Sequence, residues 1–222
     1  MTLPKKRQLT HDRLRTSVQR LLLETDWTDI TVQHVSSQAG VSIGTFYNYY
    51  DSKDDALRDV RTCLTELVKK DILLVLNTQA EVESRISILI KYFINILNSQ
   101  STWANYFYRA ESFADRLDGG LVSLLEPLIL ESALFQKSHF KDAKIAAQFV
   151  ENGIYPLLKN YHDKNQVVPE SESVQIVILA LSAMGLIGSS LDSAAKVVCP
   201  MTPLASLPQS IYELENTKAG YA

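Results

Sequence analysis

Hydroxyl, phenol and amide side chains gather between residues 42 and 53 of this 222-residue sequence, and no acidic residue precedes Asp51 in this stretch. Such groups donate hydrogen bonds to the phosphate oxygens and base edges of nucleic acids. A lysine at the end of the stretch adds a positive charge that favours the same partner. We therefore expect a DNA-contacting surface from its polar side chains, which are Ser42, Thr45, Tyr47, Asn48, Tyr49 and Lys53.

The segment before this stretch has helical spacing. Val32, Val35 and Ala39 recur three and four residues apart, which predicts a helix with one apolar stripe. Thr31 can cap the start of this helix through its side-chain oxygen. Gly40 follows the last turn, where a residue in the left-handed conformation commonly ends a helix. A tight turn is therefore expected between this helix and the polar stretch.

The polar stretch itself is expected to form a second short helix. Ser42 can cap it, and Phe46 and Tyr50 form a buried pair four residues apart. An ordinary helical hairpin is the alternative, but it does not explain two outward tyrosines beside a small glycine and a threonine. An exposed helix of this kind suits a DNA groove.

The two helices resemble the DNA-binding module of the TetR (tetracycline repressor) family of transcriptional regulators. The preceding helix, roughly residues 12–25, also fits the first helix of that family, so the resemblance covers about residues 10–60. Only helical character and order match beyond this region. The matching positions are Thr31, Ala39-Gly40-Val41-Ser42, Gly44-Thr45-Phe46-Tyr47, Tyr49-Tyr50, Ser52-Lys53 and Leu57.

The resemblance implies a recognition helix over residues 42–49 that enters the major groove. It assigns phosphate contacts, which fix the register of the protein on DNA, to Thr31, Thr45, Tyr47, Tyr49 and Lys53. Base contacts are then expected from the variable outward positions Ile43, Gly44 and Asn48. An asparagine can bond adenine at two atoms, and an isoleucine can touch a thymine methyl group.

Three positions depart from the family pattern. Asp26 stands where a glycine usually ends the first helix, and Ile43 stands at a position that is often polar or basic. Tyr50 replaces a phenylalanine, so its hydroxyl needs a hydrogen-bond partner or solvent. The base preference of the protein is therefore open, while the assignment to the family stands.

Positive charge is concentrated at the amino terminus. Residues 1–20 hold six basic side chains against Asp12 alone, which gives a local charge of +5, whereas the whole chain has a net charge of −3. Residues 63–222 hold 13 basic and 17 acidic side chains. This distribution is typical of a DNA-binding head on a nearly neutral body, although a solvated basic tail is the alternative.

The composition indicates a globular chain built of long helices, since 46% of the residues are hydrophobic and only 8 are glycine and 7 proline. Cys63 and Cys199 lie far apart and form no metal or redox spacing, which fits the reducing cytoplasm. We expect no signal peptide, no metal and no cofactor. An enzyme is the rival class, but none of the four histidines has metal-ligand spacing, and no nucleophile elbow or phosphate loop occurs.

The helical periodicity predicts an all-α protein of about nine helices. The resemblance to the TetR family implies a three-helix helix-turn-helix head followed by a larger helical ligand-binding and dimerisation body. The predicted domains are 1–58 for the head, 59–199 for the body and 200–222 for a tail. Beyond the head, helices are expected over about 53 to the low seventies, 82–97, 103–116, 121–137, 142–162 and 172–191.

The last two long helices would, by the resemblance, pair with those of a second copy in a four-helix bundle. Ala180, Met184 and Gly188 lie four residues apart, as a small-residue ridge that lets another helix approach. An intramolecular core helix is the alternative that the sequence leaves open. A membrane span over residues 174–191 is disfavoured, because a span needs about 20 predominantly apolar residues.

The body should bind a small-molecule effector if it behaves as the family does. A mostly aromatic pocket with few polar groups suits an apolar or aromatic effector. The aromatic side chains could instead fill a core, and the body could instead bind a protein partner. The expected lining is Phe93, Trp103, Tyr106 and Phe107, with polar contacts from Asn152 and Tyr155. The prediction is thus a cytoplasmic repressor that binds double-stranded operator DNA as a homodimer and responds to an effector of unknown identity.

Overall fold

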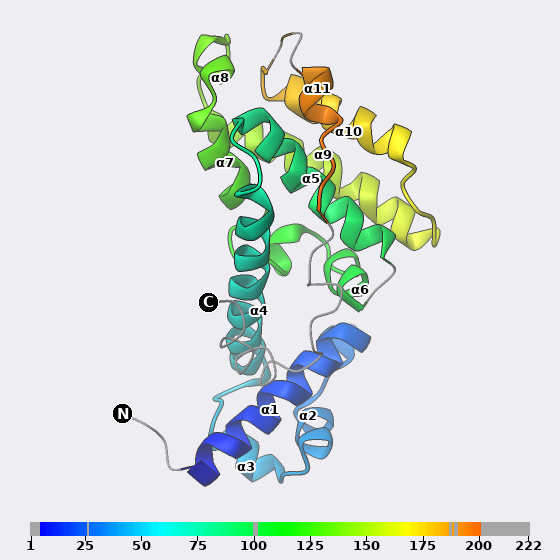
Figure 1. The fold of residues 1–222 in the computed structure, drawn as a ribbon. Helices are drawn as coiled ribbons and strands as arrows, with labels where there is room; N and C mark the ends of the chain where they lie inside the picture. Colours follow the sequence, from blue (N-terminus) through cyan, green and yellow to red (C-terminus); the bar gives the residue numbers. More distant parts are fainter. Residues whose placement is uncertain (1–4, 26, 100–101, 187, 189–190, 201–222) are drawn as a thin grey trace. The chain divides into compact units, whose positions relative to one another are not determined.

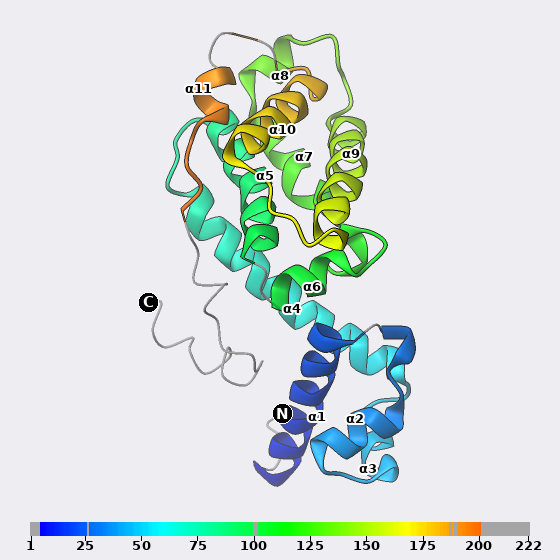
Figure 2. The same cartoon turned by 90° about the vertical axis from the view of Figure 1, so that its right-hand side faces the viewer.

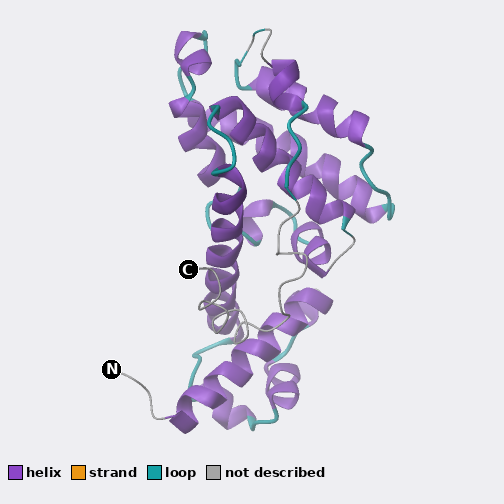
Figure 3. Cartoon of the chain, viewed as in Figure 1, coloured by secondary structure: helices purple, strands orange, loops and turns teal. Residues whose placement is uncertain are grey.

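The computed structural model describes residues 5–25, 27–99, 102–186, 188 and 191–200. These residues form eleven α-helices and two short 3-10 helices, and no strand occurs among them (Figure 3). The expected all-α class is confirmed. The chain divides into two units, and among the described residues the first extends to Leu67 and the second begins at Val68. The division falls inside one helix, α4 (Lys53–Leu76), nine residues after the predicted boundary.

The first unit contains three helices and the start of α4. The helices are α1 (Lys5–Glu24), α2 (Val32–Ala39) and α3 (Ile43–Tyr47), with a 3-10 turn at Trp27–Asp29 (Figure 1). The α1 helix packs against α2, and α2 packs against α3. Leu14, Val18, Val35 and Phe46 are almost fully buried between them.

Local capping explains why α2 and α3 begin and end where they do. The Thr31 side chain accepts a hydrogen bond from the His34 amide, and Ser42 accepts one from the Thr45 amide. Gly40 adopts the left-handed conformation, with φ of 64°, and its amide donates to carbonyls at the end of α2. The predicted caps and the predicted glycine turn are confirmed.

The second unit surrounds one buried helix, α5 (Val82–Asn98), in which twelve residues are buried. The α7, α9, α10 and α11 helices and the short α6 pack against α5 (Figure 2). A helix that is apolar on nearly all sides lies in a core. The bounds of the neighbours are Thr102–Tyr108 for α6, Val122–Glu131 for α7, Ala133–Lys137 for α8, Ala143–Asp163 for α9, Glu170–Ala183 for α10 and Leu191–Ala195 for α11.

The structure corrects three of the predicted helices. The predicted helix 103–116 ends at Tyr108 and is followed by a 3-10 turn at Phe113–Asp115. The predicted helix 121–137 is two helices, because Ser132 has an extended backbone with ψ of 122° and caps α8 with its side chain. The predicted helix 172–191 ends at Ala183. The count of about nine helices was therefore too low.

The early end of α10 removes the geometry on which the small-residue ridge depended. Gly185 has a φ of 77°, and its amide donates a hydrogen bond to the Ser182 carbonyl. The amide of Leu186 donates to the Leu181 carbonyl. This is the left-handed cap that stops a helix. Met184 lies beyond the helix and is fully buried in the chain's own core, and Gly188 is exposed and outside any helix. Ala180, Met184 and Gly188 therefore do not form one ridge.

Among the helices of the described ranges, none combines the length and apolar character that a membrane crossing requires.

Candidate nucleic-acid interface and ligand-binding region

The predicted DNA-contacting side chains lie on the first unit around α3. The side chains of Ile43 and Tyr47 are 45% and 54% exposed. Thr31, Ser42, Gly44 and Asn48 are also exposed, and Thr45, Tyr49 and Lys53 are half-buried. The expected core pair of Phe46 and Tyr50 is buried. The α3 helix, which we predict to be the recognition helix, thus presents the predicted polar face outward.

Lys53 lies close to the start of α2. Its Nζ donates a hydrogen bond to the Ile30 carbonyl at 2.9 Å, and Ile30 directly precedes the N-cap residue Thr31. The contact brings a positive charge to the amino-terminal end of α2, where free amides also favour an anion. Two residues with predicted phosphate contacts are therefore neighbours in the structure.

Ser42 and Tyr49 are engaged within the protein. The Ser42 hydroxyl lies 2.9 Å from the Thr45 hydroxyl, besides capping α3. The Tyr49 hydroxyl donates to the Arg7 carbonyl at 3.1 Å, and its ring stacks on His11 with centroids 5.7 Å apart. To contact a phosphate, the Tyr49 hydroxyl would have to leave the Arg7 carbonyl and donate to a phosphate oxygen instead.

Tyr50 has the partner that its hydroxyl requires. The hydroxyl donates to Asp59 Oδ2 at 2.8 Å and lies 3.0 Å from His11 Nε2, while Arg15 Nε lies 3.2 Å from the same carboxylate oxygen. Burial, with the Asp59 carboxylate beside it, raises the pKa of the Tyr50 hydroxyl far above its ordinary value of 10.0. This network joins α1 to α4 behind the recognition helix. Sequence reasoning missed it, because no local spacing links residues 11, 15 and 59.

The aromatic residues of the second unit form one buried cluster. The ring centroids of Phe93 and Phe107 lie 5.5 Å apart, those of Trp103 and Tyr106 5.7 Å, and those of Phe113 and Tyr155 4.8 Å. These spacings are those of packed aromatic pairs. The structure therefore brings together five of the six residues predicted for the effector pocket, which are Phe93, Trp103, Tyr106, Phe107 and Tyr155.

Asn152 does not join this cluster. It is exposed, and its Nδ2 donates to the Gln148 carbonyl within the same helix. The buried face of α9 includes Val150 and Ile154, and Asn152 lies two residues from each, about 200° around the helix. Its predicted place in the pocket lining was wrong for this reason.

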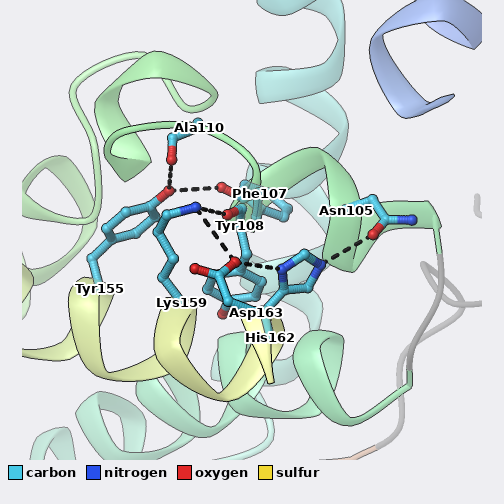
Figure 4. A network of polar contacts seen from close by, with 8 residues as sticks. All are labelled: Asn105, Phe107, Tyr108, Ala110, Tyr155, Lys159, His162 and Asp163. Carbon is cyan, nitrogen blue, oxygen red and sulfur yellow. Dashed lines mark hydrogen bonds and ion pairs between the residues drawn. The ribbon is translucent and has the colours of Figure 1, made fainter. Parts of the chain in front are cut away.

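Three side chains of α9 hold the end of α6 (Figure 4). The Tyr155 hydroxyl donates to the carbonyls of Phe107 and Ala110, at 3.1 and 2.6 Å. Lys159 donates to the Tyr108 carbonyl at 2.7 Å, and His162 Nε2 lies 3.0 Å from Asn105 Oδ1. Carbonyls at the end of a helix lack intrahelical partners, so these bonds satisfy groups that would otherwise be unpaired. Burial raises the pKa of the Tyr155 hydroxyl, which therefore remains a donor.

The second unit has two pockets, one that the sequence did not indicate and one between the two helices expected to pair with a second copy. One, of about 340 Å³, lies beside the network of Figure 4 and is lined by Leu97, Ala104, Asn105, His162, Asn165 and Gln166. The other, of about 190 Å³, is an apolar groove between α9 and α10. Its lining is Phe149, Val150, Gly153, Ile154, Leu157, Ile176, Leu179, Ala180 and Ala183.

No group of three or more histidine, cysteine, aspartate or glutamate side chains that could hold a metal ion occurs in the described part of the chain.

The sequence and the fold were compared with those of known proteins. Residues 19–60 match the family model of the bacterial regulatory proteins of the tetR family, whereas no curated protein matches the chain. RolR in complex with resorcinol has the same fold, with a TM-score of 0.66, 16% identity, and coverage of 89% of this chain and 98% of RolR. FadR from Bacillus subtilis in complex with stearoyl-CoA gives a TM-score of 0.56 at 16% identity, over 82% of this chain and 97% of FadR.

A capped helix-turn-helix with an exposed second helix is the arrangement found in DNA-binding heads. Residues 19–60 therefore form a DNA-binding module of the TetR type, and the remainder of the chain shares the fold of its structural neighbours. The matching family model describes bacterial regulatory proteins, and a further neighbour, FadR from Bacillus halodurans, is a regulator of fatty acid degradation.

Proposed function

We propose that this regulator is a cytoplasmic repressor that binds a palindromic operator as a homodimer and leaves it when an apolar or aromatic effector binds. The observation that carries the proposal is the outward face of α3, where the large side chains of Ile43 and Tyr47 are exposed. Ile43, Gly44 and Asn48 would read bases there, and the surrounding hydroxyls and Lys53 would contact phosphates.

The groove between α9 and α10 supports a homodimer. Phe149 and Leu179 on its rim are 69% and 67% exposed, and Ile145 on the same helix as Phe149 is 62% exposed. A second helix can approach closely at Gly153, because a Cβ built there meets no atom within 4 Å. This surface replaces the ridge predicted from the sequence, although Ala180 also lines it. A palindromic site would match the two-fold symmetry of such a dimer.

The aromatic cluster supports an aromatic effector. RolR, which has this fold, was crystallised with resorcinol, an aromatic compound. In this chain the rings around Phe107 come from α5, α6 and the turn after it, with Tyr155 of α9 at their edge. A flat apolar ligand could replace ring-to-ring contacts by ligand-to-ring contacts of the same kind.

The test is binding of the purified protein to fragments of its own promoter region, followed by fluorescence anisotropy across a range of salt concentrations. We expect a salt-sensitive complex with two copies of the protein on one symmetric site, and light scattering should show a dimer without DNA. Absence of any salt-sensitive complex contradicts DNA binding. A complex of one copy on an asymmetric site contradicts the palindromic homodimer and leaves DNA binding intact.

A further inference from the structure

The basic side chains near the amino terminus take different positions in the structure. Arg15 is buried and forms an ion pair with Asp59 inside the first unit. Arg13 and Arg20 are exposed, and both line a groove of about 290 Å³ between α1 and α2. The positive charge of this segment is therefore divided between an internal ion pair and an external groove.

Helix geometry places the groove's donors on one side of α1. Arg13, Thr16 and Arg20 lie at positions i, i+3 and i+7, which share one helical face. Asp12 also lines the groove, so the described lining has two guanidinium groups against one carboxylate, a net charge of +1. The remaining lining residues are Leu9, Ser17, Gln38 and Ala39.

The opposite wall of the groove is oriented by Ser17. The Ser17 hydroxyl donates to the Val35 carbonyl at 2.9 Å and lies 3.0 Å from the side-chain amide of Gln38, which belongs to α2. A hydroxyl has a single proton, so the side-chain amide of Gln38 is the second polar neighbour of Ser17. A neutral amide side chain therefore lines the groove together with the two arginines.

Gly40 allows Arg13 to lie against the helix-turn-helix turn. A Cβ on Gly40 would stand 2.6 Å from Arg13 Nη2, so any other residue would displace the guanidinium. Gly40 precedes Ser42, the N-cap of the recognition helix, by two residues. Arg13 thus presents charge beside the turn that leads into the DNA-reading helix.

We propose that this groove binds a phosphate group. Two planar guanidinium groups and an amide supply several N–H donors, which match a tetrahedral anion with several oxygen acceptors. The phosphate can come from the backbone of operator DNA or from a small free phosphate. The first source rests on the proposed DNA-binding function, and it would extend the protein–DNA contacts beyond the helix-turn-helix.

The first arm of the test measures the salt dependence of DNA binding. The double variant Arg13→Gln/Arg20→Gln should lower the magnitude of the slope of log K against log salt by roughly one to two, since each phosphate contact contributes about 0.9. Affinity should fall about equally for operator and unrelated DNA, because phosphates carry no sequence information. The control Lys137→Gln/Lys196→Gln removes the same charge from exposed sites of the second unit and should keep the wild-type slope.

The second arm omits DNA and uses inorganic phosphate and pyrophosphate as probes, at ionic strength matched with chloride. The wild-type protein should show a rise in melting temperature that Arg13→Gln/Arg20→Gln loses and that Arg13→Lys/Arg20→Lys retains in part. A change in the first arm alone identifies the DNA backbone as the source, and a change in the second alone identifies a free phosphate.

An unchanged slope together with an unchanged response to phosphate overturns the proposal. Circular dichroism of the variants shows whether α1 remains folded, and Gln38→Ala, at an exposed position of α2, should weaken the same responses if α1 does not tolerate the double change. A wild-type protein that binds no DNA contradicts the proposed function. The melting-temperature measurement with phosphate and pyrophosphate then tests phosphate binding in the groove without DNA.

Discussion

Lys53 Nζ donates a hydrogen bond to the carbonyl oxygen of Ile30 at 2.9 Å. This bond links the first residue of α4 to the residue that precedes the N-cap of α2. An ammonium group carries three N–H donors, so this bond is compatible with the phosphate contact that we propose at the same helix start. Lys53 therefore has a structural role as well as the DNA-binding role that we propose for it.

The variant Lys53→Ala should weaken binding to all DNA sequences and reduce the magnitude of the salt slope by about one, because one phosphate contact is lost. It should also destabilise the first unit by roughly 0.5–1.5 kcal/mol, since a hydrogen bond to Ile30 disappears. Anisotropy titrations and urea unfolding measure the two effects. Lys137→Ala, an exposed lysine of the second unit, is the control and should change neither.

The variant Asn48→Ala should behave differently, because Asn48 is exposed and uncharged on the outward side of α3. We expect a change in base preference worth about 1–3 kcal/mol at one operator position, with an unchanged salt slope. Binding to a set of single-base operator variants measures it. A uniform loss across all variants would place Asn48 among the backbone contacts instead.

Local signals made the DNA-binding unit predictable, and tertiary contacts made other parts unpredictable. The caps at Thr31 and Ser42 and the glycine turn at Gly40 act within four residues, so the sequence alone indicated them. The end of α10 was missed, because Gly185 stands within an uncharged, largely apolar run that resembles a continuing helix. Arg15 is buried because it pairs with Asp59, whereas Arg13 and Arg20 line the groove. The sequence did not indicate this difference, since Asp59 lies 44 residues from Arg15 in the chain.

The variant Leu179→Arg should convert a dimer into a monomer. The side chain of Leu179 is 67% exposed, so an arginine there remains in solvent in the monomer but would be buried and unpaired in a dimer, at a cost of several kcal/mol. DNA affinity should fall as well, since two linked heads bind a two-part site more tightly than one. Leu74→Arg, at a 55% exposed position on α4, is the matched control. Light scattering that shows a monomer for the wild-type protein at micromolar concentration contradicts the proposed interface.

The variant Tyr50→Phe should be less stable than the wild-type protein at neutral pH, and the difference in the free energy of unfolding should shrink in alkaline solution. At neutral pH the missing hydrogen bond to Asp59 should cost about 1–2 kcal/mol. The raised pKa of Tyr50 means that the unfolded chain releases this proton above its ordinary value of 10.0, while the folded chain retains it. The stability of the wild-type protein should therefore fall, relative to the variant, by about 1.4 kcal/mol per pH unit above 10.

Urea unfolding from pH 8 to pH 11, followed by a signal from the first unit, measures this difference. Tyr47→Phe alters an exposed tyrosine of the same unit and should match the wild-type protein at neutral pH. A constant gap between wild type and Tyr50→Phe over the whole range would show that the Tyr50 hydroxyl ionises equally in both states.

An effector that enters the aromatic cluster should change the fluorescence of Trp103, whose ring lies 5.7 Å from that of Tyr106 and is almost fully buried. Trp27 also emits, so the measurement uses Trp27→Phe protein. The effector can act on DNA binding only if it binds the DNA-bound and released arrangements with different affinities. A coupling of about 1–3 kcal/mol would weaken operator binding roughly 5- to 150-fold, and operator DNA must then weaken effector binding by the same factor. Aromatic compounds that change the Trp103 signal but leave operator affinity unchanged would show that the cluster is an uncoupled pocket, and the proposed release mechanism would be wrong.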